Sequence, residues 1–173
     1  MVLVRDAVDG DFADIQAIYA EHVLHSIATF EEIPPSVEEM RNRHRAIIDS
    51  GLPYLVAEVD GIVTGYCYAA LYRARSAYRF TIEDSIYIRR GQVGGGIGTA
   101  LLSELISRCE QGPWRQMLAV IGDSGNAASL GLHRKMGFTH AGALKSVGFK
   151  HGRWIDTVLL QRPLNAGDGS LPE

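Results

Sequence analysis

The chain contains only two cysteines, Cys67 and Cys109, in 173 residues. Two cysteines are too few for a disulfide framework, and because both fall in apolar-periodic stretches, we expect buried thiols. No apolar run approaches the roughly 20 residues of a membrane span. The first residues, MVLVRDAVDGDF, carry acidic groups where a signal peptide has its apolar core. These absences predict a cytoplasmic protein that does not bind membranes.

An excess of basic charge is also missing. Lysine and arginine together number 17 against 20 acidic residues, which gives a formal net charge of −3. A nucleic-acid-binding face gathers cations against the phosphates, so this balance argues against such a partner. Hydrophobic residues make up 46% of the chain, which suits one domain with a sizeable core. We expect a single domain over residues 1–164 and a disordered tail over residues 165–173.

Clusters of metal ligands are absent from the sequence too. His22 and His25 have a metal-like spacing near the end of a helix, yet no carboxylate or cysteine motif accompanies them. We interpret both as surface residues and expect no metal.

The chain does contain a regular order of short elements. Apolar spacing predicts a helix from Asp11, its N-cap, to about residue 24. A second helix follows the capping box of Ser36 and Glu39 and ends at Gly51. Asp60 and Gly61 predict a hairpin turn. Further helices are expected from the glycine-dense stretch 91–98 to about residue 110 and at 127–136, and strands at 2–6, 53–58, 62–72, 80–88, 116–121, 139–148 and 154–162. This order predicts an α+β (mixed α/β) fold with a largely antiparallel central sheet flanked by four helices.

A glycine-rich turn, QVGGGIGTALL, joins the strand at 80–88 to the next helix. Unpaired N–H groups at a helix N-terminus attract anions, so the turn suits a pyrophosphate. A flexible connector is the other interpretation. The P-loop pattern fails because no Lys-Ser/Thr pair follows the glycines. The Rossmann pattern fails because Leu101 replaces its third glycine and the turn follows the fourth strand instead of the first.

This turn resembles the acetyl-CoA loop of the GNAT superfamily, whose pattern is Gln or Arg, two residues, Gly, one residue, then Gly or Ala. Gly96-Ile97-Gly98 match its second half, whereas Val93 holds the Gln/Arg position and Gln92 comes one residue early. The departure puts one side-chain contact with the pyrophosphate in doubt. The resemblance implies acetyl-CoA as cosubstrate, bound by Ile86, Tyr87, Ile88, Val93, Gly94, Gly95, Gly96, Ile97, Gly98, Thr99 and Asn126.

Segments along nearly the whole chain resemble the phosphinothricin acetyltransferase-like branch of this superfamily, which includes acetylases of methionine sulfoximine. They are ATFEE (28–32), YRFTIEDSIYI (78–88), the glycine turn, NAASLGLHRKMGF (126–138) and VGFKHGRWIDT (147–157). The resemblance implies a GNAT-type fold and a homodimer. The implied reaction is N-acetylation, by direct attack, of a small amino acid or a glutamate-like analogue such as phosphinothricin, methionine sulfoximine or methionine sulfone.

Acetyl transfer to nitrogen requires a neutral amine, so a base has to remove a proton near neutral pH. Glu83 matches the general base of the resembling branch, acting directly or through a water; the alternative is a solvated glutamate. Asp84 faces the other side of the strand and forms no catalytic pair with it. His133 stands where many GNAT enzymes have a tyrosine acid, and three roles stay open: protonating the thiolate, assisting as a base, or packing.

Backbone N–H groups of residues 86–88 are expected to hold the thioester carbonyl if the strand splays from its neighbour. Asn126 either contacts the cosubstrate or caps a helix. Guanidinium groups bind carboxylates in two parallel hydrogen bonds, so the arginine-rich stretch before Glu83 would orient an amino acid, or else forms a solvated basic edge. The candidate acceptor-binding residues are Phe30, Glu31, Tyr72, Arg73, Arg75 and Arg79.

The loop of Lys150, His151, Arg153 and Trp154 matches a branch signature that tends to lie at a site shared across a homodimer. Two other functions stay open on the sequence alone. One is acetylation of a protein N-terminus or lysine, and the other is an acyl-CoA-binding module without turnover.

Overall fold

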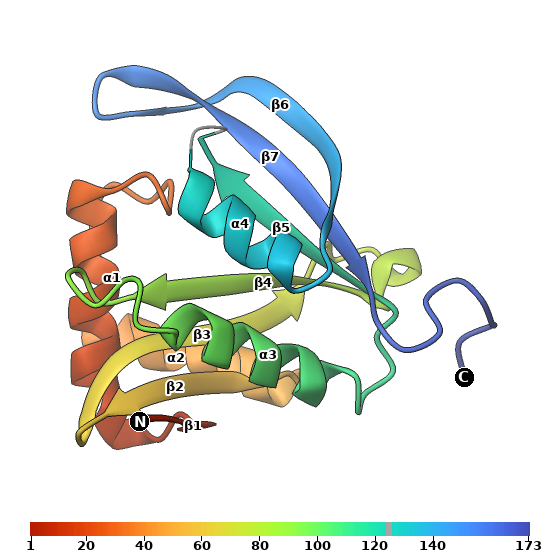
Figure 1. Cartoon of the computed structure of the whole chain (residues 1–173), viewed down its shortest axis with the longest axis horizontal. Coiled ribbons are helices and arrows are strands. Elements are labelled where there is room, and N and C mark those ends of the chain that lie inside the picture. The colour runs from red at the N-terminus through yellow and green to blue at the C-terminus, as the bar shows by residue number, and fades with distance from the viewer. Residues whose placement is uncertain (124–125) are drawn as a thin grey trace.

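The computed structural model describes residues 1–123 and 126–173. Within these ranges seven strands form one sheet, and four α-helices pack on it (Figure 1). The predicted α+β fold class is confirmed. The strands are β1 (Val2–Asp6), β2 (Tyr54–Val59), β3 (Ile62–Leu71), β4 (Thr81–Ile88), β5 (Gln116–Gly122), β6 (Thr139–Lys150) and β7 (Arg153–Pro163). The helices are α1 (Phe12–His25), α2 (Val37–Asp49), α3 (Ile97–Cys109) and α4 (Ala127–Lys135).

The strands follow the order β1-β2-β3-β4-β5-β7-β6. Every neighbouring pair is antiparallel except β4 and β5, which are parallel and joined through α3. One buried cluster, with Leu101, Leu102 and Leu105, packs α3 on the sheet, and a second, with Phe12 and Ile15, packs α1 on the opposite face. The apolar spacing of each helix thus places a helix layer on both sides of the sheet.

Two tight turns were readable from the chain. Asp60 and Gly61 take φ values of 52° and 78°, and His151 and Gly152 take 52° and 73°. Two consecutive residues with positive φ form the turn that best matches the twist of a hairpin. They close the hairpins β2–β3 and β6–β7 and fix the register of each pair.

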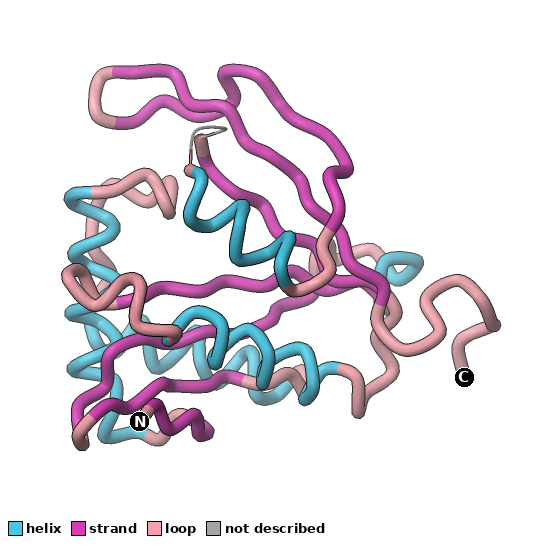
Figure 2. The backbone as a smooth tube through the Cα atoms, in the orientation of Figure 1, coloured by secondary structure: helices cyan, strands magenta, loops and turns pink. Residues whose placement is uncertain are grey.

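The sheet opens between β4 and β5. The two strands pair only at Thr81↔Gln116, Ile82↔Met117 and Glu83↔Leu118, and beyond that point they diverge (Figures 1 and 2). From Asp84 onward β4 keeps its β3 partner but has no partner on the β5 side in the described structure. The splay expected at residues 86–88 is therefore present, and it leaves backbone polar groups facing the opening.

Several boundaries differ from the predictions. Asp11 makes no side-chain cap to α1; its carboxylate binds Arg5 at 2.8 Å and accepts a hydrogen bond from the Val8 N–H. Ser36 accepts from the Glu39 N–H as predicted. The side chain of Glu39, however, pairs with Arg43.

The strand expected over 62–72 ends at Leu71, and residues 72–80 form a loop with a 3-10 turn at Ser76–Tyr78. In the segment after β7, Leu164 is buried and Arg115 donates hydrogen bonds to the carbonyls of Gly167 and Leu171. These contacts join the last segment of the chain to Arg115.

Candidate active site

A cleft of about 490 Å³ runs between the glycine turn, the end of β4 and α4. Gly94 and Gly96 take φ values of 95° and 80°, which only glycine adopts readily, so the turn folds tightly under the cleft. Gly96 precedes α3 and supplies no side-chain cap, which leaves the first N–H groups of that helix for a ligand. The cleft is thus suited to a pyrophosphate and an extended pantetheine arm.

Most of the predicted cofactor residues line this cleft. Eight do so: Ile86, Ile88, Val93, Gly94, Gly96, Gly98, Thr99 and Asn126. Tyr87 instead points to the α1 face, where its ring packs on Tyr19, and Ile97 belongs to the core. Gly95 is not among the lining residues either.

Gly98 allows the elements at the floor of the cleft to pack closely. A Cβ at this position would lie 3.1 Å from Leu132 and 3.2 Å from Ile88, so glycine lets α3 approach both α4 and β4. Asn126 caps α4, since its Oδ1 accepts from the Ser129 N–H at 3.3 Å, and it also lines the cleft; its contact with the cosubstrate stays a prediction.

Six residues that line the cleft were missed by sequence reasoning, among them His22 and Lys135. The His22 Nε2–H donates to the Ile88 carbonyl at 2.8 Å, which ties α1 to the end of β4. Its interpretation as a surface residue is wrong, because helical spacing reveals the face of a helix but not what packs against it. Lys135, in the last turn of α4, also lines the cleft and offers an ammonium to an anion.

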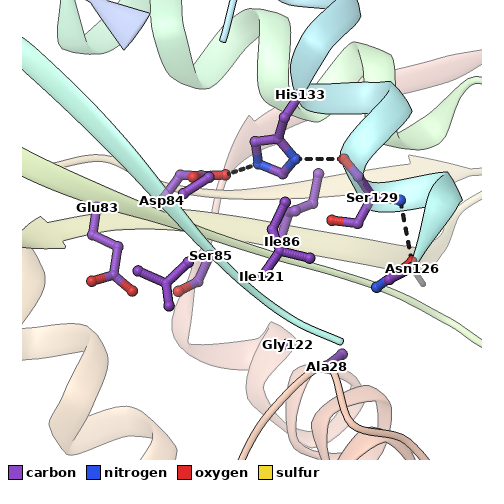
Figure 3. A pocket seen from close by; sticks show the side chains of 12 residues that line it. Ala28, Glu83, Asp84, Ser85, Ile86, Ile121, Gly122, Asn126, Ser129 and His133 are labelled. Carbon is purple, nitrogen blue, oxygen red and sulfur yellow. Dashed lines mark hydrogen bonds and ion pairs between the residues drawn. The ribbon is translucent and has the colours of Figure 1, made fainter. Parts of the chain in front are cut away.

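A smaller pocket of about 70 Å³ occupies the opening between β4 and β5 (Figure 3). Its walls are Glu83, Asp84, Ser85 and Ile86 of β4, residues 119–122 of β5, the α4 N-cap Asn126, two residues of α4 and Ala28. The Glu83 side chain points to one side of β4, and the Asp84 and His133 side chains lie on the other. Burial, followed by the charge of Asp84, raises the pKa of the Glu83 carboxyl. A carboxyl group with a raised pKa therefore lies where the sheet opens.

His133 is held from both ring nitrogens. Its Nε2 lies 2.8 Å from Oδ2 of Asp84 and its Nδ1 lies 2.8 Å from the Ser129 carbonyl oxygen. The residue is 2% exposed. Burial lowers the pKa of the imidazole, but the hydrogen bond to Asp84 and the charge of that carboxylate outweigh it, so the pKa is raised. The ring has no nitrogen left for a further partner.

The segment between α1 and α2, residues 26–36, is called the acceptor loop. Phe30 of this loop packs where Gly148 has no side chain: a Cβ there would lie 2.5 Å from the Phe30 ring. Gly122 of β5 leaves room for the same loop, since its Cβ would lie 2.7 Å from the Ile27 carbonyl oxygen. The loop is therefore fitted to the end of β5 and to the β6–β7 hairpin.

Lys150 anchors the acceptor loop from the hairpin. Its side chain is 1% exposed, and the ammonium donates to the Thr29 carbonyl at 2.7 Å. Burial lowers the pKa of this ammonium, and the charges of Glu32 and Glu31 only partly oppose the effect. Glu31 itself accepts hydrogen bonds from Arg43 and from the Tyr19 hydroxyl. Its carboxylate thus stabilises the loop.

The structure does not bring the arginine-rich stretch into either pocket. The guanidinium of Arg73 stacks over Tyr72 at 4.9 Å, and that of Arg79 stacks over Phe80 at 4.5 Å. Arg79 has helical dihedral angles, so the strand parity that placed it on the face of Glu83 does not extend to it. Arg73 and Arg75 also share no strand, because β3 ends before them. These residues border the start of β4 as an exposed loop.

In the described part of the chain, no three His, Cys, Asp or Glu side chains come together as a metal site. The helices found there are too short or too polar to cross a lipid bilayer. Both predicted buried thiols are confirmed: Cys67 and Cys109 are inaccessible in the core.

The geometry agrees with comparisons to known proteins. The family model for the acetyltransferase (GNAT) domain matches residues 4–159. A phosphinothricin N-acetyltransferase of Alcaligenes faecalis is 63% identical over 170 residues, covering 98% of this chain and 86% of its own length. An L-methionine sulfoximine/L-methionine sulfone acetyltransferase of Pseudomonas paraeruginosa is 39% identical, covering 94% of each chain.

Among solved structures, a GNAT superfamily phosphinothricin acetyltransferase of Sinorhizobium meliloti in complex with acetyl-CoA superimposes with a TM-score of 0.96. It is 49% identical, and the match covers 99% of this chain and 93% of that one. The sheet divides between β4 and β5, a glycine turn precedes the N-terminus of α3, and the family model matches most of the chain. The chain belongs to the GNAT acetyltransferase family.

Proposed function

We propose that this protein transfers the acetyl group of acetyl-CoA to the amino group of a small amino acid or glutamate-like analogue. Phosphinothricin, methionine sulfoximine and methionine sulfone are the acceptors that the names of its relatives suggest. The observation that carries the proposal is the position of Glu83, a partly buried carboxylate at the last residue of β4 that pairs with β5, beside the opening in the sheet.

The chemistry follows from that position. The acceptor enters as an ammonium and loses a proton to Glu83, which frees the nitrogen lone pair. The nitrogen attacks the thioester carbonyl, whose developing negative charge is met by N–H groups along the unpaired edge of β4. The carbon–sulfur bond then breaks, the thiolate of CoA leaves, and the extra proton on the former amine nitrogen passes through solvent to the thiolate, which gives the amide and CoA thiol. A thiol of ordinary pKa, about 8.5, needs little help to depart.

Direct attack is preferred to an acetyl-cysteine intermediate. Both cysteines are buried in the core on the α3 side, and burial raises the pKa of the Cys109 thiol to about 12. Since the thiolate is the nucleophilic form of cysteine, neither residue is suited to accept an acetyl group.

As contacts of the acceptor carboxylate we propose Arg73, Arg75 or Arg79 of the exposed loop before β4, with Tyr72 beside them; because these residues lie outside both pockets, the loop would have to approach Glu83 when the acceptor binds. Phe30 and Glu31 remain the proposed contacts from the acceptor loop. We also propose a homodimer in the cytoplasm, because apolar residues of the β6–β7 hairpin are left exposed; they are Leu144, Val147, Phe149 and Trp154.

The test is thiol release from acetyl-CoA with a panel of amines: the three analogues, common amino acids, polyamines and a lysine peptide. We expect release only with amino acids that carry a free carboxylate. Glu83→Gln should lower kcat by at least about 100-fold, in the range of a lost general base. Glu21→Gln, an exposed change on α1, is the matched control and should leave the rate unchanged.

Other outcomes separate the alternatives. Release with the lysine peptide alone would identify a protein acetyltransferase. Tight acetyl-CoA binding without release for any amine, and without any effect of Glu83→Gln, would identify a binding module.

A further inference from the structure

We propose that Asp84 and His133 form a positioning pair that fixes the narrow end of the opening between β4 and β5. The pair thereby sets how the acetyl thioester lies relative to Glu83. The inference rests on the proposed function for the identity of the reaction, but its structural part concerns the donor alone.

The pair lies at the point where the strands part. Glu83↔Leu118 is the last register pair of β4 and β5, and Asp84 is the next residue of β4. The Asp84 side chain points to the α4 face and meets His133 Nε2 at 2.8 Å. Helix α4 follows β5 in the chain. One side-chain contact thus joins the two halves of the sheet where backbone pairing stops.

The orientation of the imidazole is fully determined. A carbonyl oxygen only accepts, so Nδ1 carries a hydrogen and donates to Ser129 at 2.8 Å. The Phe138 ring packs edge-on at 4.9 Å between ring centroids. To protonate a departing thiolate, His133 would have to break one of its two hydrogen bonds. These hydrogen bonds therefore favour a positioning role over proton transfer.

Asp84 depends on His133 in turn. The carboxylate is 6% exposed, and its Oδ1 is buried without a hydrogen-bond partner among the residues described. A buried carboxylate needs a compensating group, and His133 is the one that contacts it. The two side chains therefore stabilise each other. Tilting α4 away from β4 would leave the buried Asp84 carboxylate without its compensating partner.

The tilt of α4 matters because its first turn faces both pockets. Asn126 and Ser129 line the cofactor cleft and the pocket in the opening alike. A shift of α4 moves these walls relative to Glu83, which is carried by β4. Misplacing a reacting group by about 1 Å can slow a reaction by about 100-fold.

The first experiment compares Asp84→Asn with Asp84→Ala. Asparagine can donate its amide hydrogen to Nε2 of a neutral imidazole, which keeps the link and removes the charge. We expect Asp84→Asn to retain kcat within about 5-fold, and Asp84→Ala to lose about 100-fold. The acceptor KM should change less than about 3-fold in both. Equal losses in both variants would overturn the proposal, because a proton-transfer role needs the carboxylate and a positioning role does not.

The second experiment needs no acceptor. The infrared carbonyl band of acetyl-CoA labelled with ¹³C at the carbonyl is recorded on the protein. We expect the same band for the wild type and Asp84→Asn, and a shift toward the free thioester in Asp84→Ala. An unchanged band in Asp84→Ala would overturn the proposal. If the wild type releases no thiol with any amine, the proposed function fails while this band still decides on the pair.

Asp49→Asn, at the end of α2, is the matched control for loss of a carboxylate. If Asp84→Ala does not fold, Asp84→Leu replaces it, since leucine keeps the volume and removes the hydrogen bond. Acetyl-CoA affinity within about 3-fold of the wild type shows that a variant has kept its cofactor cleft.

Discussion

At the scale of single residues, burial of Glu83 opposes folding, while it would serve the proposed role of this carboxylate as a base. Burial and the neighbouring charge of Asp84 raise the pKa of its carboxyl above the ordinary 4.5. The folded protein therefore binds this proton more tightly than the unfolded chain does. Stability is lost as the pH rises from the unfolded pKa through the folded one.

Replacing Glu83 with glutamine should accordingly stabilise the protein at neutral pH. We expect the melting temperature to rise by about 2–4 °C at pH ~7, as for a gain of about 1 kcal/mol in a domain of this size. At pH ~4 the gain should vanish, because the carboxyl is then protonated in both states. Thermal denaturation at both pH values measures the difference.

The same pKa should appear in the rate. In the wild type, kcat/KM should fall at acid pH with a midpoint above pH 4.5, and Glu83→Gln should remove this fall. An equal fall in melting temperature at both pH values would contradict this account, since it would indicate lost packing.

At the scale of elements, the acceptor loop depends on glycines that lie far from it in sequence. Gly148 of β6 lies under the Phe30 ring, and Lys150 on the same strand binds the loop backbone. Strand β6 therefore shapes the loop that we propose to contact the acceptor.

Gly148→Ala should displace Phe30, because the new Cβ would lie 2.5 Å from its ring. We expect a loss of about 1–3 kcal/mol in stability, as for other overpacked sites, and a rise in the acceptor KM with little change in acetyl-CoA affinity. Steady-state kinetics and chemical denaturation provide the two measurements.

Gly142→Ala is the control, since no atom lies within 4 Å of its added Cβ and it is on the same strand. Phe30→Leu in the Gly148→Ala background should restore much of the stability, because a leucine side chain is shorter than the ring. Equal effects of the two alanines would place the cause in strand propensity instead of the loop.

The sequence revealed local structure well and long-range contacts poorly. The turns at Asp60-Gly61 and Gly96 could be predicted because few residue types readily adopt a positive φ. The end of β3 at Leu71 was not readable, since Tyr72 still donates its N–H to the Thr81 carbonyl and the following residues alternate like a strand. For the same reason the arginines were given a strand face that they do not have.

The burial of Lys150 and the bond from His22 to Ile88 were beyond local reasoning too. Both join segments more than 60 residues apart in the chain. The resemblance identified the segments around Lys150, yet a short motif does not say which of its residues faces inward.

At the scale of the whole molecule, the β6–β7 hairpin ends the sheet with an unusually apolar surface. Phe149 and Trp154 are 58% and 66% exposed, and their rings pack together at 5.1 Å between centroids. Exposed apolar groups gathered on one element mark an interaction surface. A second copy of the chain is the proposed partner.

Sedimentation should therefore find a dimer for the wild type, and Trp154→Glu should shift it toward a monomer by burying a charge in the interface. Leu171→Glu is the control, since that residue is 90% exposed in the last segment of the chain and carries no part of the hairpin. A monomeric wild type at concentrations of about 100 µM would refute the interface.

The three-residue junction between β4 and β5 also has a meaning for how the chain folds. Strands β2, β3 and β4 pair with their neighbours in sequence, and β1 closes on β2, so this half of the sheet can form while the remainder is still being synthesised. The other half, in which β7 inserts between β5 and β6, needs the end of the chain. The junction between β4 and β5 therefore forms late and consists of few backbone pairs. Local opening of the sheet costs the least free energy there, which is where we propose that the thioester enters.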